Sequence, residues 1–291
     1  MGGWNTANIP DLSGRTYIVT GATSGLGAAT ARGLAEAGAQ VIMACRNEIK
    51  AQAVAHTITG GRVQIRALDL ADLNSVRAFA DSVEHADVLI NNAGVMAVPR
   101  GRTADGFETH FGTNFLGHFA LTGLLLDRIS ERVVNVSSHT HYIGRIDLED
   151  PHWERRAYSR FGAYAQTKLA LLHLTYELQR RFDSAGSPKL AVAAHPGYAA
   201  TEINSKAENF LEQFIDIGNR VLAQSVEMGA LPTLYAAVAA ARPGAYYGPD
   251  SWWGWRGHPV ETASSAASHD EKTARQLCEL AERSTGVELR V

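Results

Sequence analysis

Short apolar runs alternate with segments of helical periodicity along most of this chain. The apolar runs have the length of strands, and in the segments between them apolar residues recur every three or four positions. Strands are predicted at 15–20, 40–45, 63–68, 87–91, 132–137, 189–194 and 245–247. Helices are predicted at 25–37, 48–59, 72–83, 107–129, 162–182 and 224–240.

Strands that alternate with helices indicate a parallel sheet covered by helices on both faces. Right-handed crossovers between these parallel strands then give a doubly wound topology. We therefore expect an α/β protein, a single-domain doubly wound Rossmann fold with a parallel sheet of about seven strands. Residues 1–11 are expected to form an N-terminal extension, and 245–291 a C-terminal extension.

Composition narrows the class of protein. The 291 residues carry a formal net charge of −3, and without a basic run a nucleic-acid partner is not expected. No apolar run reaches the roughly 18 residues that cross a bilayer, and no secretory signal is visible. The only cysteines, Cys45 and Cys278, suit a reducing compartment, so we expect a cytoplasmic protein.

A glycine-rich turn joins the first predicted strand to the first predicted helix. Such a turn lets the backbone approach a diphosphate, which the helix N-terminus stabilises. A plain tight turn is the alternative, but the strand before it and the helix after it argue for a dinucleotide. The residues of the turn that we expect at the cofactor are Gly21, Thr23, Ser24, Gly25, Leu26 and Gly27.

The next strand ends bear on which dinucleotide is bound. After the second strand, where NAD-specific sites usually place an acid, the chain has Cys45 and Arg46. A guanidinium suits a 2′-phosphate, so NADP(H) is favoured and NAD(H) remains possible. Beside Leu70, Asp69 could accept from the adenine amino group or cap the following helix. Asn92, Ala93 and Gly94 are expected near the adenine-side ribose.

Four further residues form a candidate catalytic set. Tyr164 and Lys168 are four apart and share one face of a predicted helix. The lysine charge favours the phenolate, so Tyr164 can act as acid or base, and Lys168 can also hold the nicotinamide ribose. Ser138, at a strand end, can polarise the substrate oxygen. Asn114 could hold a water that relays protons to Lys168.

With these residues in this order, the chain resembles the short-chain dehydrogenase/reductase family. The resemblance covers nearly the whole sequence from Leu12 to the C-terminus. The matching segments are 20–27, 69–70, 91–94, Asn114, 136–138, 164–168 and 195–197. The resemblance implies that Asn114, Ser138, Tyr164 and Lys168 form a catalytic tetrad, with Ser138 rather than Ser137 as its serine. It also implies that Pro196, Gly197 and Thr201 lie beside the nicotinamide carboxamide.

Within that family the chain is most similar to the soluble retinol-dehydrogenase-like members, on residues 44–47, 114–119 and 247–249. It lacks the apolar N-terminal anchor of membrane-bound retinol dehydrogenases, which counts against a retinoid. The family places a substrate lid at 198–225. Apolar residues recur there at helical spacing, as on a lipophilic pocket or on an ordinary amphipathic helix. His139 and His141 are interpreted as loop residues, and no metal is expected.

The sequence therefore predicts an NADP(H)-dependent oxidoreductase for a small lipophilic carbonyl or alcohol. Two alternatives stay open, a non-catalytic NADP-binding redox regulator and, less favoured, a nucleotide-sugar epimerase or dehydratase. Relatives often form dimers or tetramers through their long helices. Leu169, Leu172 and Tyr176 would offer an apolar stripe for that, unless the stripe belongs to the core.

Overall fold

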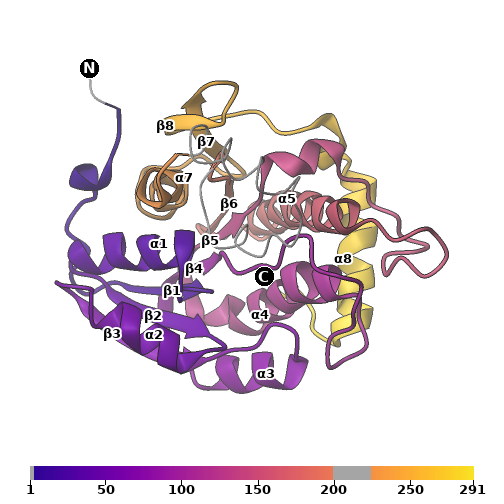
Figure 1. Ribbon diagram of the computed structural model, residues 1–291, viewed down its shortest axis with the longest axis horizontal. Helices are drawn as coiled ribbons and strands as arrows, with labels where there is room; N and C mark the ends of the chain where they lie inside the picture. Colours follow the sequence, from indigo (N-terminus) through magenta and orange to yellow (C-terminus); the bar gives the residue numbers. More distant parts are fainter. Residues whose placement is uncertain (1–2, 199–223) are drawn as a thin grey trace, which may run out of the picture.

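The computed structural model describes residues 3–198 and 224–291 (Figure 1). Its centre is an eight-stranded sheet in the order β3-β2-β1-β4-β5-β6-β7-β8. Strands β1 to β7 are parallel, and β8 pairs antiparallel with β7. The strands are β1 (Thr16–Thr20), β2 (Gln40–Cys45), β3 (Arg62–Ala67), β4 (Ala86–Asn91), β5 (Ile129–Val136), β6 (Leu190–Ala194), β7 (Tyr246–Ser251) and β8 (Arg256–Glu261).

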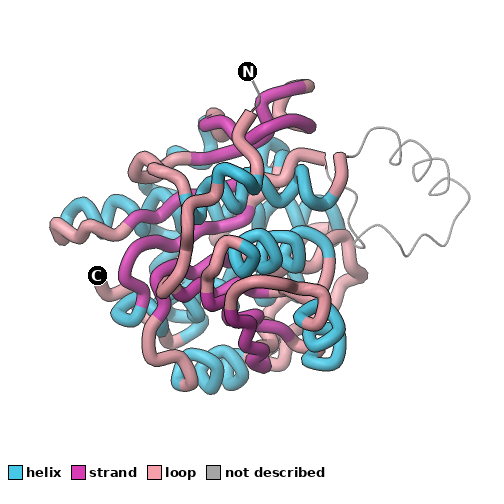
Figure 2. The backbone as a smooth tube through the Cα atoms, turned by 90° about the vertical axis from the view of Figure 1, so that its left-hand side faces the viewer, coloured by secondary structure: helices cyan, strands magenta, loops and turns pink. Residues whose placement is uncertain are grey.

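Helices cover both faces of this sheet, with the strands running through the middle (Figure 2). One face packs against α1 (Gly25–Glu36), α2 (Glu48–Ala55) and α7 (Val226–Val238). The other packs against α3 (Leu73–Asp81), α4 (Gly117–Leu125) and α5 (Arg160–Ser184). Outside α4 and α5 lies α8 (Glu271–Thr285), the yellow helix of Figure 1. This confirms the doubly wound α/β fold expected from the sequence.

The central strands are apolar on both sides because both faces are covered. In β1, Tyr17 and Val19 pack on the α1/α7 face while Ile18 packs on the α3/α4/α5 face. Thr20, Asn91 and Asn135 are fully buried polar exceptions near the ends of these strands, and the Asn91 amide donates to Thr122 Oγ1 and Asn135 Oδ1, each at 2.9 Å. These bonds tie the ends of two adjacent strands to α4.

The segment predicted as one helix over 107–129 is instead divided. A π-helical turn (Phe111–Leu116) leads into α4, and a 3-10 turn (Leu126–Arg128) ends it. Periodicity did not reveal this division, because Phe111, Phe115 and Phe119 recur every four residues through the π turn, as they would on an α-helix.

The C-terminal region contains elements that the sequence did not indicate. The short strand expected at 245–247 is longer, forms a hairpin with β8, and is followed by α8. Strand β8 has too few apolar residues to stand out, since only Val260 and Pro259 interrupt its polar sequence. Strands β7 and β8 therefore complete one edge of the sheet, and α8 packs outside α4 and α5.

The stripe of Leu169, Leu172 and Tyr176 lies in the core, each at most 8% exposed. Tyr176 stacks on His269 at 4.7 Å between ring centroids, and α8 packs along the same helix. This stripe therefore offers no surface for a second copy.

Candidate active site

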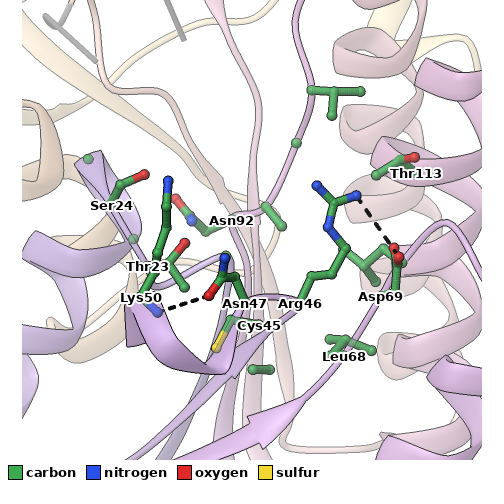
Figure 3. A pocket seen from close by; sticks show the side chains of 18 of the residues that line it. Thr23, Ser24, Cys45, Arg46, Asn47, Lys50, Leu68, Asp69, Asn92 and Thr113 are labelled. Carbon is green, nitrogen blue, oxygen red and sulfur yellow. Dashed lines mark hydrogen bonds and ion pairs between the residues drawn. The ribbon is translucent and has the colours of Figure 1, made fainter. Parts of the chain in front are cut away.

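A groove opens at the carboxyl ends of β1, β2, β3 and β4, where ligands bind in doubly wound sheets. We call it the cofactor groove (Figure 3). Twelve residues predicted at the cofactor line it: Gly21, Thr23, Ser24, Gly25, Leu26, Gly27, Arg46, Asp69, Leu70, Asn92, Ala93 and Gly94. Asn47, Lys50, Val95 and Thr113 also line it and were not predicted.

The glycine turn has the shape that its residues allow. Gly21 has a φ of +68° and Gly25 of +51°, values that favour glycine. A Cβ on Gly27 would lie 2.4 Å from the Gly21 carbonyl, so only glycine lets the helix start this close to the turn. Ser24 begins α1 without a side-chain cap, which leaves the first backbone amides of the helix free to bind an anion.

Two cations flank the far end of the cofactor groove. The Arg46 side chain is 77% exposed and lies 4.0 Å from Asp69 Oδ2, and Lys50 extends along the opposite wall toward Ser24 (Figure 3). Asn47 Oδ1 accepts from Lys50 N and so starts α2 beside both. Asp69 does not cap α3, because Asp72 does so, accepting from Asn74 N at 2.9 Å. The Asp69 carboxylate instead accepts from Ala71 N and faces Arg46.

The turn after β4 is held by the end of β1. Thr20 Oγ1 accepts from the backbone amides of Asn92 and Ala93, both at 2.9 Å. The Asn92 side chain donates back to the Thr20 carbonyl at 2.8 Å. This side of the cofactor groove is therefore fixed by the protein before any ligand arrives.

Tyr164 lies in the second turn of α5, and Ser159 caps this helix by accepting from Gly162 N with its hydroxyl. Burial raises the pKa of the Tyr164 phenol to about 12, and a hydrogen bond with the Ser138 side chain acts in the opposite direction. The Ser137 hydroxyl points elsewhere and donates to the Lys168 carbonyl. The structure therefore brings Ser138, not Ser137, against the phenol.

Lys168 is buried one turn further along α5. Its ammonium donates to the Val136 carbonyl at 2.7 Å and lies 5.6 Å from the centroid of the Tyr164 ring. Burial lowers the pKa of the ammonium to about 8. No carboxylate within the described residues is paired with it. Among the described residues, the phenol of Tyr164 therefore lies near a buried amino group that no carboxylate neutralises.

Asn114 lies in the π-helical turn and joins the cofactor groove to α5. Its side-chain oxygen accepts from Val95 N at 2.8 Å, and its amide donates to Val95 O and to Thr167 Oγ1. A Cβ on Gly94 would lie 3.3 Å from this oxygen, so glycine allows the close approach. All four predicted catalytic residues thus gather around the amino-terminal part of α5.

The long segment between Ser138 and Tyr164 wraps around a buried carboxylate. Glu108 accepts from His110 N, His110 Nδ1, Phe111 N and the Tyr158 hydroxyl, at 2.7 to 3.0 Å. These hydrogen bonds keep the pKa of Glu108 below its usual value despite burial. The His110 ring meets the Tyr164 ring edge-on at 6.5 Å. We call Glu108, His110 and Tyr158 the Glu108 cluster, which contacts the Tyr164 ring through His110.

The other predicted residues lie after β6. Gly197 has a φ of +66°, and a Cβ there would meet the Trp255 carbonyl at 2.4 Å. Pro196 O accepts from the Gln224 side chain. Neither residue lines the cofactor groove. Thr201 lies outside the described residues, and so do residues 199–223 of the lid predicted at 198–225, with their apolar stripe.

The hairpin turn between β7 and β8 contacts the segment that follows β6. Tyr198 N donates to Trp255 O, and the ring of His139, which follows Ser138, faces that of His195 at 4.6 Å. Trp252 and Trp253 form the exposed tip of the hairpin, both with positive φ. They therefore lie near the catalytic end without being buried in it.

Several functional candidates escaped sequence reasoning. Lys50 follows Arg46 by four positions, but Arg46 precedes α2 and the two side chains lie on opposite walls, so helical spacing gave no signal of a second cation. Glu108 and His110 carried no local signal either, because their importance depends on Tyr158, 48 residues or more away in the chain.

Comparisons with known proteins agree with this geometry. Residues 15–212 match the family described as short chain dehydrogenase. The chain is 40% identical to human retinol dehydrogenase 13, over 97% of this chain and 87% of that protein. It is 43% identical to mouse polyprenol dehydrogenase, over 79% and 73%. The crystal structure of an uncharacterised protein from Mycobacterium paratuberculosis matches with a TM-score of 0.88 and 48% identity, over 99% and 100%.

The chain therefore belongs to the short-chain dehydrogenase/reductase family of oxidoreductases, whose members bind nicotinamide cofactors, and it has relatives among the retinol dehydrogenases. Among the described residues, none of the helices combines the length and the apolar character needed to cross a membrane.

Proposed function

We propose that this protein is an NADP(H)-dependent oxidoreductase acting on a lipophilic alcohol or carbonyl, with Tyr164 as acid and base. The observation that carries the proposal is the buried contact of Tyr164 with Ser138 beside the unpaired charge of Lys168. The names of the relatives support the substrate class, since retinol and polyprenol are both lipophilic alcohols.

The position of each side chain suggests its chemical role. A nicotinamide bound here would supply or accept the hydride. Tyr164 gives a proton to the substrate oxygen during carbonyl reduction and takes it back during alcohol oxidation. Ser138 donates to the same oxygen as charge develops. Lys168 favours the phenolate, and Asn114 holds the Val95 backbone beside the site.

The preference for NADP(H) rests on the two cations of the cofactor groove. Arg46 and Lys50 approach it from opposite walls, and the acid that would accept from a ribose 2′-hydroxyl is absent from the end of β2. Asp69 would remain to contact the adenine, and the free amides of α1 would hold the diphosphate. Both cysteines are free and buried, which suits the reducing cytoplasm where we place the protein.

The test is turnover of NADPH and NADP against panels of lipophilic aldehydes, ketones and alcohols, with cofactor binding measured separately by fluorescence titration. We expect turnover of at least one compound, and a loss of about a thousandfold or more in Tyr164→Phe with NADPH binding retained. Tight NADPH binding with no turnover across broad panels would instead favour the regulator. Full activity in Tyr164→Phe would refute the assigned mechanism.

A further inference from the structure

A buried histidine that the proposed mechanism does not use connects the π-helical turn that carries Asn114 to the end of β1 beside the cofactor groove. His118, in the first turn of α4, has no exposed surface. Its Nδ1 is 2.9 Å from the Asn114 carbonyl oxygen, and its Nε2 is 3.0 Å from Thr20 Oγ1. Both ring nitrogens are therefore engaged, one on each side of the site.

These partners determine the tautomer. A carbonyl oxygen only accepts, so Nδ1 carries the hydrogen and donates to Asn114. Burial lowers the pKa of the imidazole to about 4, so the ring is neutral near pH 7 and Nε2 is an acceptor. The Thr20 hydroxyl then donates to Nε2 at 3.0 Å, while the alternative acceptor, the Ile90 carbonyl, lies further away at 3.3 Å.

Thr20 extends the connection into the cofactor groove. The same hydroxyl oxygen that meets His118 accepts the amides of Asn92 and Ala93, which line the groove. A continuous path of hydrogen bonds therefore runs from the groove wall through Thr20 and His118 to the backbone of Asn114. The Lys168 charge is close enough to His118 to lower its pKa further.

We propose that His118 is a positioning residue that holds the Asn114 carbonyl, and with it the π-helical turn, and couples this carbonyl to the cofactor side of the site through Thr20. The inference rests on the proposed function and deepens it, because it assigns a role to a residue that contacts neither cofactor nor substrate. A carbonyl has two lone pairs, so the Asn114 oxygen can accept from His118 and still receive a second donor. A substitution at one end of this hydrogen-bonded path should therefore alter the geometry at the other end.

The test combines substitutions at the two ends of the His118–Thr20 bond. His118→Leu removes both hydrogen bonds, and His118→Gln keeps a donor and an acceptor on a flexible side chain. Thr20→Val removes the hydroxyl, and Thr20→Ser keeps it. We expect His118→Leu to lower kcat about tenfold, with little change in the KM of the carbonyl substrate, and His118→Gln to recover part of the loss.

The double variant His118→Leu/Thr20→Val distinguishes coupling from two separate effects. Since Thr20 also serves Asn92 and Ala93, Thr20→Val alone is expected to weaken NADPH binding more than His118→Leu does. If the two residues act through one bond, the double variant is less impaired than the product of the single effects on kcat and on the NADPH Kd. Independent effects, which multiply, would overturn the proposal.

His173 provides a matched control. It is equally buried, its pKa is likewise lowered to about 4, and its Nδ1 has no hydrogen-bond partner in the part of the chain that the structure describes. We expect His173→Leu to leave kcat within about twofold. If His118→Leu changed only Tm, with kcat and Kd equal to those of the unmodified protein, His118 would be a packing residue and the proposal would fail.

The outcome can be separated from failure of the proposed function. If the unmodified protein turned over no compound, the function would fail while NADPH titrations of the same four variants still measured the coupling. Non-additive Kd values would then retain the link between His118 and the cofactor side, and additive values would remove it.

Discussion

The two halves of the site differ in how far water reaches their charges. In the cofactor groove, Arg46 is 77% exposed and its nearest carboxylate is 4.0 Å away. In the catalytic half, Lys168 and Tyr164 are buried, and burial raises the pKa of Tyr164 to about 12 and lowers the pKa of Lys168 to about 8. The same type of charge is therefore expected to have small effects in one half and large effects in the other.

This difference separates recognition from chemistry. An exposed cation can attract a phosphate and release it again, because solvent screens the interaction. A buried ammonium next to a phenol changes the energy of proton transfer directly, at the expense of stability. The substitutions below test whether burial, rather than position along the cleft, determines the size of each effect.

The largest effect is expected from Lys168→Met, with opposite signs for activity and stability. Turnover should fall about a thousandfold or more, because the phenolate loses its neighbouring charge. The free energy of unfolding at pH 7 should rise by up to about 3 kcal/mol, because a buried cation with a pKa of about 8 no longer has to be desolvated. Denaturant unfolding and turnover assays would measure both.

The pH dependence checks the cause of that gain. The unfolded state of the unmodified protein binds the Lys168 proton more tightly than the folded state does. Its stability should therefore increase relative to Lys168→Met between pH 8 and about 10.5, and the difference should stay constant below pH 8. A difference that does not vary with pH across this window would mean that packing, not charge, is responsible.

The Glu108 cluster should show the next largest effect, without involving a reacting group. Glu108→Gln replaces one carboxylate oxygen by a donor and leaves at least one of four buried donors without a partner, which should cost about 2 kcal/mol or more. Tyr158→Phe removes the hydroxyl that donates to Glu108 and lies 3.0 Å from His110 Nδ1, and it should cost about 1 kcal/mol. Equal stability of Glu108→Gln and the unmodified protein would show that the cluster is not structural.

The cofactor groove was easier to predict than the catalytic half, because its residues form short local segments of the sequence. The glycine turn, Arg46 and the 91–94 turn are local sequences whose meaning depends on adjacent strands and helices. The fold followed from the alternation of apolar segments, because buried parallel strands must be apolar on both faces. The local sequence pattern was therefore enough to predict those parts of the site whose residues are close together in the chain.

The parts that escaped prediction depend on distant contacts. The π-helical turn at Asn114 keeps a helical apolar pattern, and the role of Glu108 requires Tyr158, 50 residues later. Strand β8 is at the sheet edge with one antiparallel partner, so it lacks the apolar pattern of a central strand. In each case tertiary structure, not local sequence, selected the conformation.

Charge substitutions in the cofactor groove should have moderate, salt-dependent effects. We expect Arg46→Asp to lower the ratio of kcat/KM for NADPH to that for NADH by about tenfold or more, and Lys50→Ala to lower it less. Added salt should reduce the difference from the unmodified protein. Lys272→Ala, at an exposed position on α8, is the control and should leave the ratio unchanged. An unaltered ratio in Arg46→Asp would contradict the assigned cofactor preference.

The smallest effect is expected from Trp253→Gly, although this residue lies at the rim of the catalytic half. Trp253 is 90% exposed with a φ of +55°, a conformation that costs a non-glycine residue about 1 kcal/mol. Its replacement should leave kcat within about twofold and raise stability slightly. Gly254→Ala in the same turn should instead destabilise, because its Cβ would lie 2.7 Å from His139 Nε2. If Trp253→Gly abolished turnover, position in the cleft would matter more than burial, and the comparison between the two halves would have to be redrawn.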